Sequence, residues 1–205
     1  YLFSTSLGEV LVITAALVLG YPLPLLASQI IWLNFVTDGF LTVALAMEPK
    51  EEGLLSGKFQ KQKKYLVDRL MVVTMFTMAL PMMVGSIVLF HFYYEYDFAK
   101  ASTIALTAMA VFQWFNVWNS RSETKSIFRM NFFSNWYLIA ATALVVVLQI
   151  LAVYTPFFQH ILRTVPLTFM EWLLIVPVAA SIVVVEEVRK FIYRRMLARR
   201  HARAK

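Results

Sequence analysis

The 205-residue chain is 60% hydrophobic and only 15% charged, and its mean hydropathy is +0.67. Soluble globular domains are nearer half apolar and one quarter charged, so the composition excludes an ordinary soluble fold and predicts a membrane protein. The absence of cysteine excludes disulfides, and the net charge is +7 at pH 7. Basic residues of membrane proteins collect in cytoplasmic loops, so no nucleic-acid partner is expected. The chain opens at Tyr1 in mid-pattern, which suggests a piece of a longer protein.

Two apolar segments open the chain, at residues 2–20 and 25–47, and each contains one charge, Glu9 and Asp38 respectively. A bilayer core ~30 Å thick requires ~20 apolar residues per helix, so both segments are expected to span it. The GYPLP sequence between them is predicted to be a tight turn, because its prolines cannot continue a regular helix.

Four further apolar segments follow the polar, lysine-rich stretch at residues 48–67. They are separated by short polar links, which is typical of successive membrane helices. The remaining spans are expected at residues 68–92, 101–120, 135–155 and 170–191. We therefore predict an all-α membrane protein, a bundle of six transmembrane helices.

The basic residues are distributed unevenly over the predicted links. All but Lys100 and Arg163 of the 19 Lys and Arg residues lie beside the second and fourth links and at the C-terminal end. The positive-inside rule then places both termini and the 48–67 loop in the cytoplasm. The basic tail at residues 192–205 has two interpretations, a segment that lies on anionic lipid and a solvated end of the last helix.

Polar residues inside the second segment point to a functional site, since charges at membrane depth cost ~2.5–3.5 kcal/mol. Asn34, Thr37 and Asp38 are spaced i, i+3, i+4 and are expected on one helical face. Their oxygens suit Ca²⁺, Mg²⁺ or Na⁺ better than zinc. Gly39 follows directly, and it is a position where the backbone is expected to unwind and expose carbonyl oxygens.

Glu9 is expected to face Asp38 from the first helix. At 1.5 Å per residue, Glu9 lies ~16 Å and Asp38 ~21 Å from the proline turn, so an antiparallel hairpin brings the two carboxylates to similar depth. Such a pair repels unless a cation or a proton lies between them. Thr5 and Ser6 are expected on the same face as Glu9.

Other roles stay open for these polar residues. Asn34 and Thr37 also fit interhelical hydrogen bonding without an ion, and Glu9 also fits a position close enough to the interface to reach water. Gln113 and Asn116, spaced i, i+3 in the fourth segment, suit either an additional wall of the ion site or plain packing.

Several sequence stretches resemble P-type cation-transporting ATPases, most closely the calcium pumps. QIIWLNFVTDG at residues 29–39 is similar to their sixth transmembrane helix, where the motif runs Q-x-x-W-x-N-x-x-T-D. Four further stretches are similar to other parts of these pumps. STSLGEV resembles the fifth helix, and LAMEPKEEGLL resembles the exit of the sixth. NSRSETKSIFRM resembles the link after the eighth helix, and VEEVRKFIYRR resembles the end of the tenth. The resemblance covers essentially the whole chain as helices five to ten.

This resemblance implies a set of calcium ligands. Asn34 and Asp38 match the pair that completes one site, together with a fourth-helix glutamate that this chain does not contain. Asp38 is shared with a second site, to which Thr37 and Glu9 also correspond. This chain departs from the family pattern at two positions. It has Ser6 where the family has asparagine, and Gln113 where the family has glutamate, so the second site is expected to be weakened.

The resemblance also implies the function of the longer protein, an ATP-driven cation transporter with Ca²⁺ as the expected ion. This chain has no Asp-Lys-Thr-Gly-Thr sequence and no phosphate-binding loop, so it is expected to contain no catalytic residue. ATP and Mg²⁺ are expected to bind outside it. Its expected partners are the actuator, nucleotide-binding and phosphorylation domains, transmembrane helices one to four, and the lipid bilayer. The expected location is a bacterial plasma membrane.

The residues alone leave other classes of function open. A secondary transporter or a channel would use the same intramembrane polar groups without ATP, and a structural membrane domain would only anchor a partner. Pumps for Na⁺, K⁺, H⁺ or Mn²⁺ are further alternatives within the family. Sodium–potassium pumps have aspartate where Asn34 stands, which argues against that branch.

Overall fold

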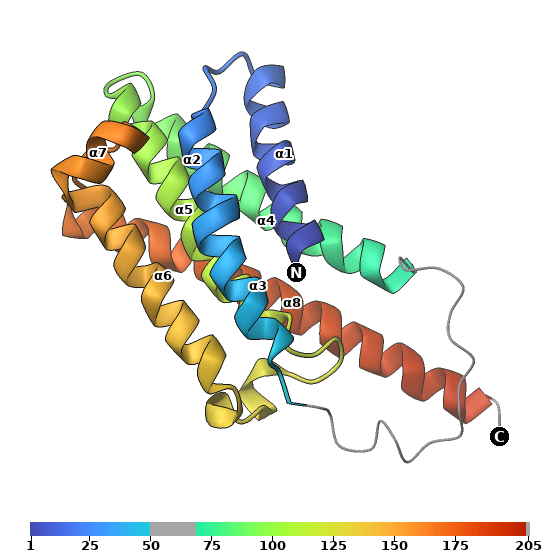
Figure 1. Ribbon diagram of the computed structural model, residues 1–205. Coiled ribbons are helices and arrows are strands. Elements are labelled where there is room, and N and C mark those ends of the chain that lie inside the picture. The colour runs from blue at the N-terminus through green and yellow to red at the C-terminus, as the bar shows by residue number, and fades with distance from the viewer. Residues whose placement is uncertain (50–68, 204–205) are drawn as a thin grey trace.

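The computed structural model describes residues 1–49 and 69–203, and all regular structure within them is helical. This confirms the all-α prediction. The α-helices are α1 Leu2–Val18, α2 Ala27–Trp32, α3 Gly39–Ala46, α4 Arg69–Tyr93, α5 Phe98–Asn119, α6 Trp136–Tyr154, α7 Pro156–Leu162 and α8 Phe169–Arg203 (Figure 1). A π-helix, η1 Leu33–Asp38, joins α2 to α3, and two short 3₁₀ turns, η2 Ile127–Arg129 and η3 Phe132–Ser134, precede α6.

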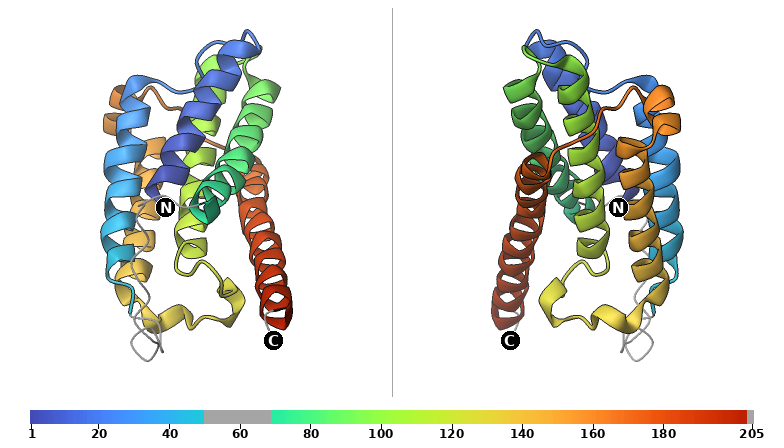
Figure 2. Two further views of the ribbon diagram at one scale, coloured as in Figure 1. Left: turned by 90° about the vertical axis from the view of Figure 1, so that its right-hand side faces the viewer. Right: turned by 90° about the vertical axis from the view of Figure 1, so that its left-hand side faces the viewer.

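The long helices run in alternating directions, with α2, η1 and α3 acting as one continuous rod (Figures 1 and 2). In the described part of the chain, four helical stretches are long and apolar enough to cross a bilayer: Ala27–Ala46, Leu70–Tyr93, Trp136–Tyr154 and Phe169–Met196. Leu2–Val18 is a shorter apolar helix. All but the first two residues of the expected 48–67 loop lie outside the described residues.

The ends of the helices follow local capping chemistry. After α1, the N–H of Gly20 bonds to the carbonyl of Leu17 and the N–H of Tyr21 to that of Ala16, which is the Schellman pattern. Gly20 has φ +73°, a conformation that a residue with a Cβ adopts at a cost. The carboxylate of Asp97 accepts the N–H of Lys100, and this N-cap starts α5 at Phe98, three residues before the expected span.

The C-terminal helix extends further than expected. The sequence placed its end near residue 191, followed by a separate basic tail, whereas α8 continues to Arg203 as a helix of 35 residues. No proline or glycine interrupts the basic segment, so the backbone hydrogen bonds of α8 propagate beyond its apolar part. Figure 1 shows this end of α8 projecting away from the other helices.

The helix α5 forms the centre of the bundle. It packs against α4, α8, η1, α3 and α6, and every residue from 101 to 113 is buried. α5 carries several polar side chains and is not among the four described stretches that are long and apolar enough to cross a bilayer. The outer helices instead expose large apolar residues, including Val18, Phe35, Val43 and Phe92.

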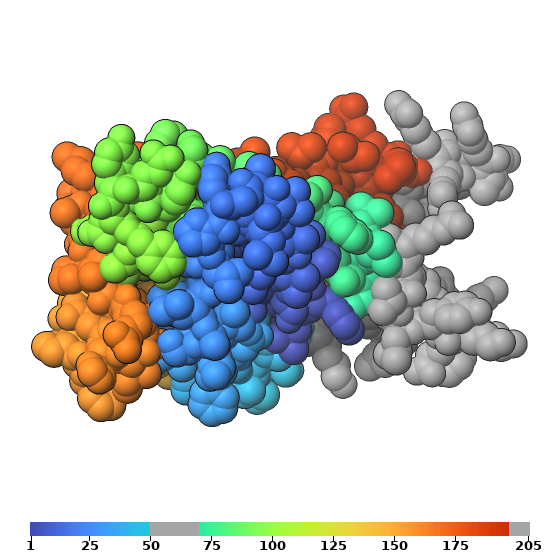
Figure 3. All heavy atoms as spheres, turned by 90° about the horizontal axis from the view of Figure 1, so that it is seen from above, coloured from blue at the N-terminus to red at the C-terminus, as the bar shows by residue number. Residues whose placement is uncertain are grey.

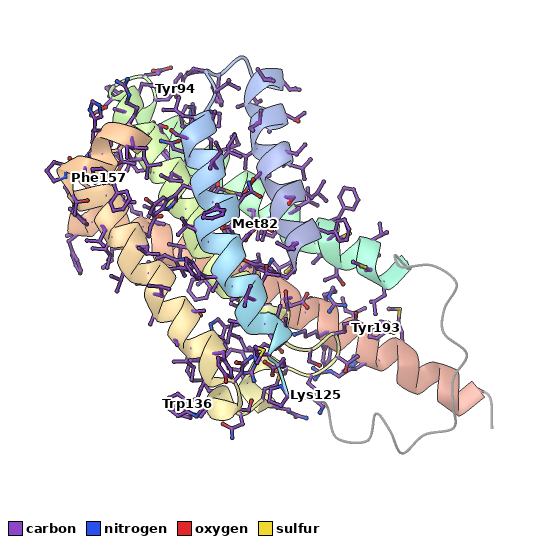
Figure 4. All side chains as sticks on the ribbon, viewed as in Figure 1. Met82, Tyr94, Lys125, Trp136, Phe157 and Tyr193 are labelled. Carbon is purple, nitrogen blue, oxygen red and sulfur yellow. The ribbon has the colours of Figure 1, made fainter. Side chains whose placement is uncertain are left out.

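The two ends of the bundle differ in their links. The end seen in Figure 3 is covered by the links after α1, after α4 and after α6. There the ring of Tyr21 lies 4.8 Å from that of Tyr94. Figure 4 places Tyr94 and Phe157 at this end and Trp136 at the opposite end. Aromatic side chains at both ends match the amphipathic belts of membrane proteins.

A buried ladder of hydrogen bonds holds α2 against its neighbours. The amide N–H of Gln29 donates to the carbonyl of Leu162 at 3.0 Å, and its amide oxygen accepts from Ser102 at 3.1 Å. The indole of Trp32 donates to Gln149 at 3.1 Å, and Gln149 donates to Thr107 at 3.2 Å. These bonds satisfy polar groups that would otherwise be costly in an apolar bundle.

Close backbone approach fixes the packing of α4. A Cβ built on Gly85 would lie 2.6 Å from the ring of Phe112 on α5 and 2.9 Å from Val178 on α8. A Cβ on Gly8 of α1 would lie 2.9 Å from the sulfur of Met82, the α4 residue labelled near the middle of the bundle in Figure 4. The thioether of Met82 is flexible, whereas the aromatic ring at Gly85 is not.

We predict that Gly85→Ala destabilises the protein by ~1–3 kcal/mol, because the added methyl overpacks the contact with Phe112. The measurement is thermal unfolding of the detergent-solubilised protein. Gly39→Ala is the matched control, since its Cβ would meet only the Asn34 carbonyl oxygen at 3.9 Å. Equal unfolding temperatures for the two variants would contradict the packing argument.

Candidate functional site

The carboxylate of Asp38 lies inside the bundle, where α1 crosses η1. Asp38 is only 1% exposed. One carboxylate oxygen accepts a hydrogen bond from the Tyr1 hydroxyl at 2.6 Å, and the other accepts from the Thr5 hydroxyl at 2.7 Å. Both donors belong to the start of the chain, so α1 and η1 are joined by this one carboxylate.

Glu9 lies one helical turn beyond Thr5 on α1 and is 5% exposed. One of its carboxylate oxygens accepts from the Asn34 amide at 2.7 Å, and the other accepts from the Gln113 amide at 3.2 Å. Asn34 comes from η1 and Gln113 from α5. The Glu9 side chain therefore lies where three helical elements meet.

The pairing of α1 with η1 has a clear antiparallel register. Moving four residues along α1, from Thr5 to Glu9, moves the contact four residues back along the rod, from Asp38 to Asn34. Residues four apart lie on the same helical face. These contacts between α1 and η1 place the two carboxylates in the antiparallel hairpin arrangement that the sequence led us to expect.

The α5 side of the site contains buried amide oxygens without hydrogen-bond partners. Asn116 donates its amide N–H to the Ser4 hydroxyl at 2.9 Å. Its oxygen and that of Gln113 are buried and have no partner. Buried polar atoms are nearly always satisfied by protein, water or an ion, so these two oxygens are available to a water molecule or an ion.

The backbone at the centre of the rod is widened rather than unwound. Residues Leu33–Asp38 form a π-helix, and Gly39 keeps helical dihedrals of φ −58° and ψ −56°. The expected break at Gly39 is therefore not observed. A π-turn shifts each backbone bond to the i→i+5 pattern, and such turns are frequent at functional sites. Within this turn Thr37 and Asp38 are buried, whereas Asn34 remains exposed on the described chain.

The sequence singled out seven residues for the site, and five of them take part in the hydrogen bonds described above. These are Glu9, Asn34, Asp38, Gln113 and Asn116. Thr37 is buried on η1 beside them. Ser6 is exposed on α1, and Thr5 is the α1 hydroxyl that reaches Asp38 instead.

Tyr1, Thr5 and Ser4 contribute more to the site than the sequence indicated. Thr5 carried a weak signal, since it shares a helical face with Glu9 four residues later. Tyr1 carried none, because its contact with Asp38 spans 37 positions of the chain. Tertiary packing alone decides such a contact.

The chemistry of the site is that of hard oxygen ligands. Two carboxylates, three amides and several hydroxyls meet here, and within residues 1–49 and 69–203 no three His, Cys, Asp or Glu side chains form a metal-binding group. Ca²⁺ takes six to eight oxygens. Turning the amides of Asn34 and Gln113 would replace an N–H by a carbonyl oxygen, so the same residues can either donate to Glu9 or face a cation.

Two ion-pair clusters lie below this site, at the end of the bundle where α3 and α5 finish. Arg121 binds Glu48 through both Nε and Nη2, at distances of 2.6–3.0 Å, and Asn135 donates to the same carboxylate at 2.8 Å. In the second cluster Arg189 binds both oxygens of Glu186 at 2.7 Å. The pair of Arg121 with Glu48 ties the loop between α5 and α6 to the end of α3. The same loop is joined to α8 by Arg189, which donates to the Glu123 carbonyl, and by Glu187, which accepts the N–H of Ile127.

Comparisons with known proteins relate the chain to one protein family. The family model described as "Cation transporting ATPase, C-terminus" matches residues 22–192. The chain is 34% identical over 184 residues to the calcium-transporting ATPase of Bacillus subtilis, covering 88% of this chain and 20% of that protein.

Two eukaryotic proteins are also similar. Calcium-transporting ATPase 1 of Saccharomyces cerevisiae is 30% identical over 190 residues, covering 91% of this chain and 20% of that protein. Calcium-transporting ATPase type 2C member 1 of Mus musculus is 27% identical over 195 residues, covering 93% and 21%. The chain thus spans about one fifth of the length of the curated relatives that it matches.

We predict that Thr5→Val and Asp38→Asn are energetically coupled, because a hydrogen bond to a buried carboxylate contributes about 1.5–3 kcal/mol. A double-mutant cycle on thermal or denaturant unfolding measures this coupling. Ser6→Ala, on the exposed side of α1, is expected to change stability by less than about 0.5 kcal/mol. Additive effects of Thr5→Val and Asp38→Asn would mean that the bond does not stabilise the fold.

Proposed function

The chain belongs to the cation-transporting ATPases, matching their C-terminal membrane region, and we propose that it forms the ion-binding part of an ATP-driven calcium pump. The observation that carries the proposal is the meeting of Glu9 and Asp38 with amide and hydroxyl oxygens between α1, η1 and α5. The calcium-transporting ATPases named among its relatives support Ca²⁺ as the ion.

The proposed membrane arrangement has six spans with both termini in the cytoplasm. Alternating passes of α1, the α2–α3 rod, α4, α5, α6 and α8 support the count (Figure 2). α5 crosses as a helix enclosed by protein, which explains its lower apolarity. The concentration of Lys and Arg beside residues 48–69, beside the α5–α6 loop and along the end of α8 supports the orientation.

The proposed calcium ligands are Glu9, Asn34, Thr37 and Asp38, with Gln113 and Asn116 as a further wall. Two carboxylates and neutral oxygens fall short of the charge and ligand number of a tight calcium site. Asn34 is exposed on the described chain, so it is the ligand placed to meet another helix. We propose that a carboxylate from outside this chain completes the site next to Asn34, as the resemblance to calcium pumps implies. Ser6 lies on the exposed side of α1 and is left out of this set.

The proposed mechanism couples this site to chemistry elsewhere in the longer protein. ATP and Mg²⁺ would bind the nucleotide-binding and phosphorylation domains, and the actuator domain and helices one to four would complete the pump. Movement of α1 against η1 would separate Thr5 from Asp38 and Asn34 from Glu9, because each of those bonds crosses the α1–η1 interface. The proposed location is a bacterial plasma membrane; one relative, 34% identical, comes from the bacterium Bacillus subtilis.

We predict that Asp38→Asn in the full-length protein abolishes calcium-dependent phosphorylation by ATP, because it removes a ligand charge at the centre of the site. Phosphoenzyme formation is measured across Ca²⁺, Mn²⁺, Na⁺ and Mg²⁺ concentrations. Ser6→Ala serves as the control, with an unchanged calcium dependence. A normal calcium response in Asp38→Asn would refute the site, and stimulation by another ion alone would refute calcium.

We further predict opposite effects for two changes at Gln113. Gln113→Leu removes an amide that bonds Glu9 and is expected to lower apparent calcium affinity by on the order of tenfold, whereas Gln113→Glu adds a third carboxylate and raises the affinity or the number of bound ions. Equilibrium ⁴⁵Ca²⁺ binding separates these outcomes. Identical binding in both variants would show that α5 is only a packing wall.

A further inference from the structure

The hydrogen-bond ladder on α2 lies directly ahead of the π-turn that carries the proposed ligands. Gln29 and Trp32 are three residues apart, so their side chains leave the rod from one face. Both residues are buried. Trp32 is the last residue of α2, and η1 begins at Leu33. A constraint on these two side chains therefore acts directly on the segment that carries Asn34 and Asp38.

Gln29 forms the outer rung of this ladder. Its amide N–H donates to the carbonyl of Leu162 at the end of α7, and its amide oxygen accepts from the hydroxyl of Ser102 on α5. The same oxygen accepts the backbone N–H of Leu26 at 3.0 Å, at the start of α2. Because hydrogen bonds are directional, these contacts with α5 and α7 fix both the depth and the rotation of α2.

Trp32 forms the inner rung. Its indole N–H donates to Gln149 on α6, and Gln149 in turn donates to Thr107 on α5. The ring of Trp32 also meets the ring of Phe158 on α7 edge-on, with the ring centroids 5.2 Å apart. The end of α2 is thus joined to α5, α6 and α7 at two successive levels.

The rod is attached again beyond the π-turn. Asn135, at the start of α6, donates to the carbonyl of Ala44 on α3 at 3.1 Å and to the carboxylate of Glu48 at 2.8 Å. Asn135 is itself buried. The rod is therefore fastened to its neighbours on both sides of η1, and the proposed ligands lie on the short π-turn between the two attachments.

The bonds from η1 to α1 differ from those of the ladder. Asn34 donates to Glu9, and Asp38 accepts from Thr5. Both bonds cross the interface that moves in the proposed mechanism. Figure 1 shows α1 on one side of the rod and α6 with α7 on the other, and none of the ladder bonds has a donor or an acceptor on α1. The ladder can therefore stay intact while α1 moves.

We propose that Gln29 and Trp32 are positioning residues for the calcium site. They hold α2 at one depth and one rotation against α5, α6 and α7, so that Asn34 and Asp38 stay turned toward the ion while α1 moves. Rotating a helix by one residue position turns its side chains by about 100°, which would carry both ligands out of the site. The inference rests on the proposed calcium site and adds two residues that are not themselves ligands.

The test compares variants of the full-length protein in nanodiscs. Trp32→Phe removes the indole N–H and keeps an aromatic ring, Gln149→Met removes its acceptor, and a double variant removes both. The measurements are the unfolding temperature without calcium and the calcium concentration that gives half-maximal phosphorylation by ATP. Each single change leaves a buried polar group without its partner and should lower the unfolding temperature, whereas the double variant leaves neither and should largely recover it.

The calcium response separates positioning from stability. The half-maximal calcium concentration should rise about threefold in both single variants, which corresponds to one interhelical hydrogen bond of ~0.6 kcal/mol. It should stay raised in the double variant, because the connection between α2 and α6 is absent there too. The maximal phosphoenzyme level should not change, since no ligand is removed. A double variant that recovers both its unfolding temperature and its calcium response would reduce the bond to a stabilising contact and overturn the proposal.

Trp118→Phe is the matched control. Trp118 is 8% exposed, against 9% for Trp32, and its indole N–H makes one bond between helices, from α5 to the hydroxyl of Thr142 on α6 at 3.2 Å. That bond does not involve the rod. The variant should therefore lower the unfolding temperature and leave the calcium response unchanged. An equal calcium shift in Trp118→Phe and Trp32→Phe would also overturn the proposal.

The outer rung provides a second pair, so the conclusion does not depend on the folding of one set of variants. Gln29→Met with Ser102→Ala should show the same lasting rise in the half-maximal calcium concentration. A normal calcium response in both double variants would refute the positioning role while leaving the calcium site intact. Wild-type protein without any calcium response would refute the proposed function and this inference with it.

Discussion

The structure depends on satisfying two carboxylates in the interior of an apolar bundle. Leaving a charge there without partners is costly, and Asp38 and Glu9 are each satisfied by donors from another element. Because the donors come from both α1 and α5, the positions of three helical elements are set by two side chains. The same requirement makes the site responsive, since any relative movement of α1 and η1 changes the partners of both carboxylates.

Helix α5 makes this arrangement possible. It is enclosed by its neighbours, so it can carry Gln113 and Asn116 beside the two carboxylates, and Thr107 in the ladder with Gln149, as buried side chains. On a helix at the outside of the bundle, polar side chains at three successive positions would lie closer to lipid, where leaving their polar groups unsatisfied costs free energy. Close packing at Gly85 and Phe112 holds α5 against α4, which links the stability of the core to the geometry of the site.

The far end of the bundle has a different chemistry from the core. There the polar groups include ion pairs, Glu48 with Arg121 and Glu186 with Arg189. The first pair and the hydrogen bonds of Arg189 to Glu123 and of Ile127 to Glu187 clamp the loop between α5 and α6 to the ends of α3 and α8. The clamp uses the acidic side chains of this region and leaves arginines on the outer surface unpaired. A rigid frame for this end of the bundle and a basic outer surface thus arise from the same set of contacts.

Much of this protein was determined by the sequence itself. Long apolar segments require helices in a bilayer because every backbone N–H and C=O must be satisfied within the segment, and the Q-x-x-W-x-N-x-x-T-D pattern at residues 29–38 marks its family. Glu9, Asn34 and Asp38 were identifiable because charged and amide side chains at membrane depth are rare and costly. Such signals are local, so they can be read along the chain.

Only the tertiary structure decided how these residues meet. The hydrogen bonds of Tyr1 and Thr5 to Asp38, the choice of Thr5 over Ser6 and the central position of α5 depend on helix rotation and packing across long separations. The π-turn at Leu33–Asp38 and the continuation of α8 to Arg203 likewise differ from the expected break at Gly39 and the separate tail. An apolar segment specifies that a helix forms. Which face it turns inward is settled by the shapes and hydrogen-bonding groups of the helices packed around it.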